Sequence, residues 1–301
     1  MKMKRMHATL LIIAAALLLS ACGAGSGTGG GKDTITIGSK NFTENIILAH
    51  MMADLIEART GLNVDRKVNL GGSNVAWKAL LNNEIQLYPD YTGTIVANYY
   101  QEETGTSGET LDKARELLKQ DNLTFTDPFG FNNTYTLAVK KETAEKYGLK
   151  TFSDLAKVAE ELILGCEFEF LDRPDGLPGL KETYGMNFKN AVGMDHGIMY
   201  RSLVEGEVDV IDAFATDGQI KVHGLVILED DKSFFPPYDA GALIRNDILE
   251  KYPEIESALN ELGGVMSESD MQALNAKVDE EGLKAEVVAR EFLAEKGLIE
   301  R

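Results

Sequence analysis

The stretch TITIGSKNFTE, residues 34–44, decides the fold, because it reads as a short strand that runs directly into a helix. Apolar and polar residues alternate up to Ile37, which predicts a strand over residues 34–38. Asn41 with Glu44 three residues later is typical of a capping box and predicts a helix over residues 43–58. A strand, a short turn and a helix in this order begin an α/β unit.

The same pattern recurs along the chain. Strands are expected at residues 65–70, 85–88, 134–140, 162–170, 208–214, 225–228 and 240–245, and helices at 74–83, from 92, at 153–161, 176–184, 197–204 and within 247–299. Strands that alternate with helices predict a mostly parallel sheet in each of two α/β lobes. The last helical portion is short of strands, so we expect it to pack on the first lobe.

The N-terminus reads as a bacterial lipoprotein signal over residues 1–21. Basic residues precede an apolar run over residues 8–21, which is shorter than the roughly 20 residues of a spanning helix. Leu19-Ser20-Ala21-Cys22 resembles a lipobox, so Cys22 is the expected lipidation site; an ordinary secretory signal is the alternative. Residues 22–33 are rich in glycine and are expected to be a flexible tether. These features predict an extracytoplasmic protein anchored to the cell membrane by lipid.

Composition excludes some partners. Asp and Glu number 48 against 30 Lys and Arg, and the formal net charge is −18. An acidic surface argues against nucleic acid and anionic lipid as partners. Apart from Cys22 only Cys166 is present, so no disulfide between two core cysteines can form. Cys166 lies in an apolar segment, which favours a buried, inert thiol.

The sequence contains no recognisable catalytic or metal-binding motif. His50, His196 and His223 are far apart and lack metal-ligand spacing. We therefore expect no metal, no cofactor and no enzymatic activity. The Gly71-Gly72-Ser73 turn before a helix either cradles an anion or is only a turn, and the second interpretation is favoured.

Aromatic residues near predicted strand ends are the strongest binding candidates, because ligands of α/β lobes bind at the carboxyl ends of strands. They are Tyr88, Tyr91, Tyr135, Phe214 and Tyr238. Each of these residues could equally belong to the core. Core or hinge packing is the better explanation for a second group of aromatic residues, namely Phe42, Tyr99, Tyr100, Phe131 and Phe234. Two loop cations, Lys40 and Arg173, precede helices and are either ligand contacts or solvated charges.

Five segments, in this order, resemble the substrate-binding lipoproteins of osmoprotectant ABC importers, the receptors for glycine betaine, carnitine and choline. The segments are GSKNFTE (38–44), YPDYTGT (88–94), RPDGLPGL (173–180), DAFATDG (212–218) and FPPY (235–238). The resemblance implies a type II periplasmic binding protein fold, a Venus flytrap of two lobes joined by two crossovers near Asn132 and Pro236. Lobe 1 then comprises residues 34–131 and 237–301, and lobe 2 residues 132–236.

The resemblance also implies the ligand site. Members enclose a quaternary ammonium group in four aromatic rings, which correspond here to Tyr91, Tyr135, Phe214 and Tyr238. In one branch a ligand carboxylate meets residues that correspond to Lys40, Thr94 and Arg173. A trimethylammonium group has no N–H to donate, so aromatic faces are what can replace its water. Phe214 departs from the tyrosine usual at its position.

The expected function is capture of a quaternary-ammonium carboxylate, namely glycine betaine, proline betaine or carnitine, for an ABC permease. Lys40 and Arg173 argue for the carboxylate, because choline would leave two cations uncompensated. A receptor for ergothioneine or choline is the alternative, and an enzyme on the same two-lobed fold is less favoured. A monomer is expected.

The lipobox generates the first prediction. Cys22→Ser should abolish acylation, because the thiol that would carry the diacylglycerol is gone. Metabolic labelling with a fatty acid measures this directly. A Cys22→Ser protein that still incorporates label would show that the lipobox interpretation is wrong.

Overall fold

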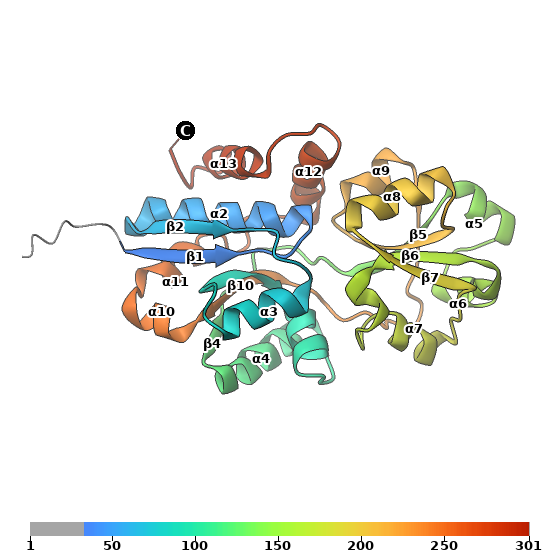
Figure 1. Cartoon of the computed structure of the whole chain (residues 1–301), viewed down its shortest axis with the longest axis horizontal. Helices are drawn as coiled ribbons and strands as arrows, with labels where there is room; N and C mark the ends of the chain where they lie inside the picture. Colours follow the sequence, from blue (N-terminus) through green and yellow to red (C-terminus); the bar gives the residue numbers. More distant parts are fainter. Residues whose placement is uncertain (1–32, 301) are drawn as a thin grey trace, which may run out of the picture. The chain divides into compact units, whose positions relative to one another are not determined.

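Two five-stranded sheets, each flanked by helices, organise residues 33–300, the part of the chain that this computed structural model describes (Figure 1). The predicted signal segment, Cys22 and all of the tether except Asp33 lie outside the described residues. The α/β two-lobed class is therefore confirmed. We call each sheet with its helices a lobe.

The strands of the first lobe's sheet lie in the order β2-β1-β3-β10-β4. Their bounds are β1 Thr34–Gly38, β2 Asn63–Lys67, β3 Leu87–Tyr91, β4 Leu123–Phe125 and β10 Ala240–Arg245. The helices of this lobe are α2 Thr43–Thr60, α3 Ser73–Leu81, α4 Ser107–Leu118, α10 Asn246–Lys251, α11 Glu254–Asn260, α12 Glu268–Asp279 and α13 Ala285–Glu295, with a π-helical segment at Thr94–Tyr99. As expected, most of the C-terminal helices complete the first lobe: α11 and α13 pack on α2.

The second lobe repeats this topology with the order β7-β6-β8-β5-β9. Its strands are β5 Tyr135–Val139, β6 Ile163–Glu167, β7 Asn190–Met194, β8 Val210–Phe214 and β9 Val226–Leu228. Its helices are α5 Lys141–Tyr147, α6 Phe152–Ala156, α7 Leu177–Tyr184, α8 His196–Glu205 and α9 Gly218–Val222, with 3₁₀ turns at Ala159–Glu161 and Phe168–Leu171. The second 3₁₀ turn ends the strand expected over residues 162–170 after Glu167. Nothing in the sequence pattern had indicated β4, β7, α5 or α9.

Each sheet is mostly parallel, as expected, because four of its five strands run in one direction and one strand runs opposite to them. In the first lobe β1 pairs in parallel with β2 and β3, whereas β10 runs antiparallel to β3 and β4. In the second lobe β6 pairs in parallel with β7 and β8, whereas β5 runs antiparallel to β8 and β9. The strands that run opposite to the others are β5 and β10, which are the first strands after the chain passes from one sheet to the other. Their neighbours end at the edge of the sheet that faces the other lobe. A strand that begins at this edge, directly after a crossover, therefore runs opposite to them.

The two connections between the sheets lie side by side. Asn132 and Asp239 form an isolated antiparallel bridge. The Asn133 amide donates to the Tyr238 carbonyl at 3.0 Å, and the Tyr238 amide donates to Asn132 Oδ1 at 2.8 Å. These bonds fit the crossovers expected near Asn132 and Pro236. The lobe boundaries at residues 131/132 and 236/237 stay a prediction.

The start of α2 differs from the sequence prediction. Phe42 is its N-cap residue and no side chain caps the helix, so Asn41 and Glu44 form no capping box. Asn45 instead accepts from the Lys40 amide at 2.7 Å and donates to the Pro89 carbonyl at 2.9 Å. Glu44 is buried and faces Tyr91. The local signal for a cap was therefore overridden by tertiary contacts.

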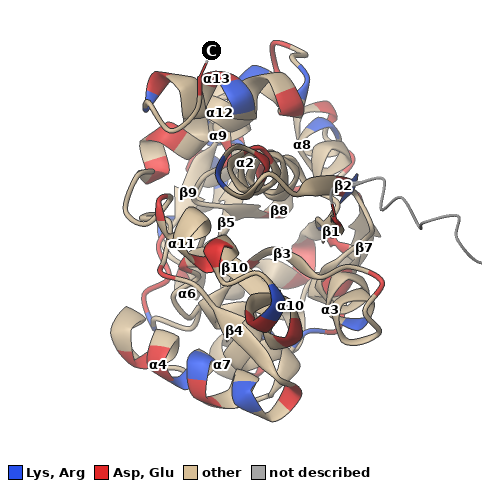
Figure 2. Cartoon of the chain, turned by 90° about the vertical axis from the view of Figure 1, so that its left-hand side faces the viewer, with Lys and Arg blue, Asp and Glu red and all other residues tan. Residues whose placement is uncertain are grey.

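Most charged side chains and Cys166 lie where such residues usually lie in a globular protein. Figure 2 shows acidic residues spread over several helices, with basic residues between them. Cys166 is fully buried, and burial raises the pKa of its thiol. Among residues 33–300, no helix combines the length and the apolar character needed to cross a membrane.

Helix α12 connects the lobes, since it contacts α9 of the second lobe. A Cβ on Gly218 would lie 2.8 Å from Ala276 Cβ and 2.9 Å from the Gln272 carbonyl oxygen. Gln272 Nε2 donates to the Ala215 carbonyl at 2.8 Å, and Asn275 Nδ2 donates to the Thr216 carbonyl at 3.0 Å. Close approach of α12 therefore depends on a residue without a side chain.

Gly218→Val should force α12 away from α9 and lower the free energy of unfolding by about 1–3 kcal/mol. Urea denaturation measures the change. Gly197→Ala, in the first turn of α8, is the control, because an added Cβ there meets no atom within 4 Å. Equal stability of both variants would contradict the proposed tight contact.

Candidate functional site

The site lies where equivalent edges of the two sheets face each other. The parallel strands β3, β6 and β8 end at Tyr91, Glu167 and Phe214. Because β5 and β10 run antiparallel, their beginnings lie at these same edges: Tyr135 pairs with Phe214, and Ala240 pairs with Tyr91. The topology thus brings strand ends and strand beginnings from both lobes to one place.

The seven residues predicted for the ligand site line one cavity there. Its lining includes the four predicted rings and the three predicted polar residues, that is Tyr91, Tyr135, Phe214, Tyr238, Lys40, Thr94 and Arg173. The cavity volume is about 20 Å³, roughly what one water molecule needs. A cavity of about 400 Å³ adjoins it and shares the lining residues Lys40, Phe42, Glu167 and Glu169. Contacts between the seven predicted residues and a ligand stay a prediction.

Most pairs of aromatic rings that line this cavity are tilted or edge-on, whereas Phe42 and Tyr91 are stacked. The Tyr135 ring lies 4.8 Å from Phe214 and 5.4 Å from Tyr238, at interplanar angles of 53° and 79°. Phe42, predicted to be core, also lines the cavity and lies 5.2 Å from Phe214. Tilted rings present several faces to one point, which is the arrangement that a rounded cationic group requires.

Two of the four rings have their hydroxyls fixed by buried acids. Tyr91 donates to Glu44 Oε1 at 2.6 Å, and Tyr238 donates to Asp175 Oδ2 at 2.6 Å. Phe214 has no hydroxyl and stacks instead on His196, with ring centroids 5.0 Å apart and planes inclined by 13°. His196 therefore supports the ring that departs from the family's tyrosine.

His196 is held between two carboxylates. Its Nε2 lies 3.0 Å from Asp217 Oδ1 and its Nδ1 lies 3.3 Å from Glu167 Oε1. Burial lowers the pKa of His196, but the charges of Asp217 and Glu167 outweigh burial and raise it well above the usual value. The imidazolium form of His196 is thus stabilised by the two neighbouring carboxylates.

The two predicted cations already have acidic partners. Lys40 Nζ lies 2.7 Å from Asp90 Oδ1, with both side chains buried. Arg173 contacts Asp175 Oδ2 at 2.6 Å and Glu169 Oε1 at 3.1 Å. The argument that choline would leave two cations uncompensated is therefore wrong, because the chain itself compensates them.

Arg173 and its neighbour Glu169 also connect the lobes. Arg173 donates to Ser73 Oγ at 3.2 Å and lies 3.4 Å from Thr94 Oγ1, both in the first lobe. Glu169 accepts from the Ser73 amide at 2.5 Å and from Ser73 Oγ at 2.8 Å. The turn that sequence reasoning weighed as an anion cradle thus receives a carboxylate of the protein.

Sequence reasoning missed five lining residues, namely Phe42, Ser73, Asn133, Glu167 and Glu169. One signal was available for two of them, because Glu167 and Glu169 are acids inside the otherwise apolar segment 162–170. A buried acid needs a partner, so such a position marks a polar site. Ser73 belongs to the glycine-rich turn that was weighed as an anion cradle, whereas Asn133 carried no comparable local signal.

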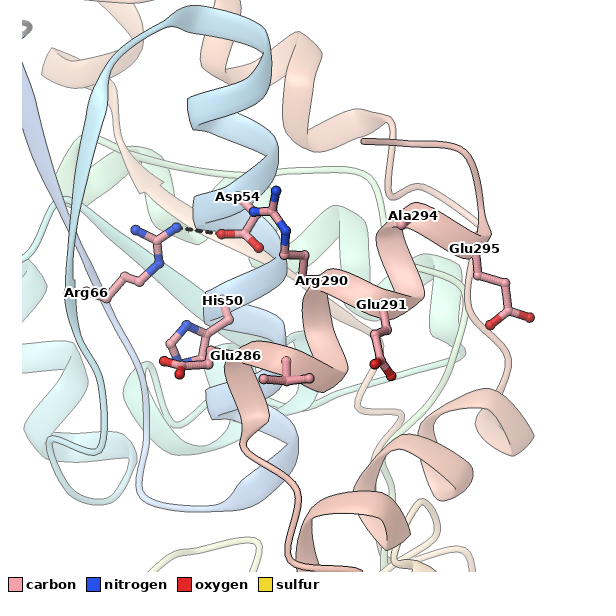
Figure 3. Close-up of a pocket in the computed structure, with 9 residues that line it drawn as sticks. His50, Asp54, Arg66, Glu286, Arg290, Glu291, Ala294 and Glu295 are labelled. Atoms are coloured by element: carbon pink, nitrogen blue, oxygen red, sulfur yellow. Dashed lines mark hydrogen bonds and ion pairs between the residues drawn. The ribbon is translucent and has the colours of Figure 1, made fainter. Parts of the chain in front are cut away.

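A different hollow, of about 1180 Å³, lies between α2 and α13 (Figure 3). Its charged residues are partly paired with each other: Arg66 contacts Asp54 at 2.6 Å. His50 also lines it, and burial lowers the pKa of this histidine. Within the described residues no group of three His, Cys, Asp or Glu side chains could hold a metal ion.

Comparison with known proteins identifies the family. Residues 33–295 match the model of the substrate-binding domain of the ABC-type glycine betaine transport system. The chain belongs to this family. It is thus a member of a family of ligand-binding components of ABC transporters, extracytoplasmic proteins that bind solutes.

Individual relatives span nearly the whole chain. The carnitine transport binding protein OpuCC of Listeria monocytogenes is 37% identical over 97% of this chain and 96% of its own length. The ergothioneine transport permease/ergothioneine binding protein EgtU of Helicobacter pylori is 36% identical over 88% of this chain and 48% of its own length. A solved structure described as a glycine betaine/carnitine/choline ABC transporter has a TM-score of 0.70 and 36% identity, covering 88% of this chain and 99% of that one.

Glu44, behind Tyr91, generates a pH prediction. Burial raises the pKa of Glu44 to about 7, partly offset by hydrogen bonds from Thr216 and Tyr91, while the charge of Asp217 adds to the rise. The unfolded chain has the ordinary value of 4.5. A carboxyl with a raised folded-state pKa contributes stability that is complete below the unfolded value and is lost as pH rises through the folded value.

Glu44→Gln should therefore make the protein more stable than wild type at pH 8, by up to about 3 kcal/mol, and bring no such gain at pH 4. Urea denaturation of both proteins at several pH values measures the difference. If the difference between variant and wild type does not change with pH, Glu44 does not titrate as its burial requires.

Proposed function

We propose that this protein captures a quaternary-ammonium carboxylate, namely glycine betaine, proline betaine or carnitine, and delivers it to an ABC permease. The observation that carries the proposal is that four rings and three polar residues, from segments far apart in sequence, line one cavity between the lobes. The match over residues 33–295 supports the same class of ligand. Lys40, Thr94 and Arg173 would meet the carboxylate.

Choline is a second candidate, favoured by the ion pairs of Lys40 and Arg173. Since Asp90 and Asp175 already neutralise these cations, the cavity does not require a ligand carboxylate. Ergothioneine is a third candidate, favoured by the adjoining cavity of about 400 Å³, which offers room beyond the rings for a larger betaine. Calorimetric titration of the protein with all five ligands ranks them.

The remaining parts of the proposal concern how the protein works in the cell. Cys22 would carry the lipid anchor, the protein would act as a monomer, and the permease would be its protein partner. No catalytic role is proposed. Binding without turnover is the expected outcome when any betaine is incubated with the protein.

Tyr135→Leu should weaken betaine binding by about 1–3 kcal/mol, because leucine keeps an apolar side chain but offers no π face to the cation. Tyr147→Leu is the control, since Tyr147 lies on α5 and does not line the cavity. Isothermal titration calorimetry with glycine betaine measures both. Unchanged affinity in Tyr135→Leu would exclude the cavity as the cation site.

A further inference from the structure

We propose that Glu169 is a specificity-determining residue: its carboxylate occupies the anion position at the start of α3 and next to Arg173. Betaines still bind, but their advantage over choline is smaller than Lys40, Thr94 and Arg173 alone would give. This inference rests on the proposed function and adds the charge selection that the family match leaves open.

The geometry places Glu169 as a resident anion. One carboxylate oxygen accepts from the Ser73 amide at 2.5 Å, and the other accepts from Ser73 Oγ at 2.8 Å and from Arg173 Nη1 at 3.1 Å. The first amide groups of a helix have no partner inside the helix and favour negative charge. The Arg173 charge lowers the pKa of Glu169 despite burial, and the Lys40 charge acts in the same direction.

The backbone at Gly72 is fitted to this carboxylate. A Cβ added at Gly72 would collide with Glu169 Oε2. Gly72 has φ −68° and ψ −178°, which other residues adopt freely, so its backbone conformation does not require glycine. Glycine is needed at this position because a side chain would prevent the close approach of Glu169.

A ligand carboxylate bound at Arg173 would lie close to the carboxylate of Glu169. Lys40, Thr94, Glu169 and Arg173 all line the same small cavity. Like charges at such short range repel strongly where water is largely excluded. A ligand with the same ammonium group and no carboxylate escapes the repulsion, and it also gains from the negative charge.

The test compares glycine betaine with choline, which share the trimethylammonium group. Glu169→Gln keeps an oxygen that can accept from Ser73 and removes the charge. We expect the Kd ratio of choline to glycine betaine to rise at least tenfold, with tighter betaine binding and weaker choline binding. Gly72→Ala pushes the carboxylate away from α3 without changing the charge, so it should shift the ratio in the same direction by about threefold.

Asp172→Asn is the matched control, because it removes one negative charge from an exposed neighbour on the same segment. It should leave the ratio within about twofold of wild type. An equal change of both Kd values in Glu169→Gln and Gly72→Ala would overturn the proposal and leave Glu169 as a contact for lobe closure. A wild type that binds none of the five candidate ligands would instead refute the proposed function, and the inference would fail with it.

Discussion

The buried guanidinium of Arg173 is the group on which the site depends. A buried charge must be paired and hydrogen-bonded, or its desolvation is not offset. Arg173 satisfies this requirement with Asp175 and Glu169 of its own lobe and with Ser73 and Thr94 of the other. The same contacts therefore pair the charge and hold the two lobes against each other.

This pairing changes how the ligand site is understood. Lys40 and Arg173 are not free cations that wait for an anion, because Asp90, Asp175 and Glu169 contact them. The selectivity of such a cavity depends on the balance of all its charges rather than on its cations. The rings are constrained in the same way, since Asp175 also fixes the Tyr238 hydroxyl. Asp175 thus both pairs with the Arg173 cation and orients the Tyr238 ring.

Repetition of one topology explains why residues so far apart meet. Both sheets place their crossover strand fourth in the order and antiparallel to its neighbours. The edge where the first three strands end is then also the edge where the crossover strand begins. Tyr135 and Tyr238, which lie directly after the two crossovers, reach the cavity for this reason.

The sequence alone determined the α/β class, most strand positions, the family and the seven predicted residues that line the cavity. Five short segments in a fixed order carry six of these residues, and the seventh, Tyr135, lies near the start of a predicted strand. It could not reveal the partners of Lys40, Glu44 and Arg173. Asp175 and Glu169 are close to Arg173 in sequence, but the other partners lie on other strands and helices, and only tertiary packing brings them within hydrogen-bonding distance. The apparent cap at Glu44 and the apparent free charge at Arg173 were local patterns, and burial decided both, since a buried polar group must find its partner wherever the fold supplies one.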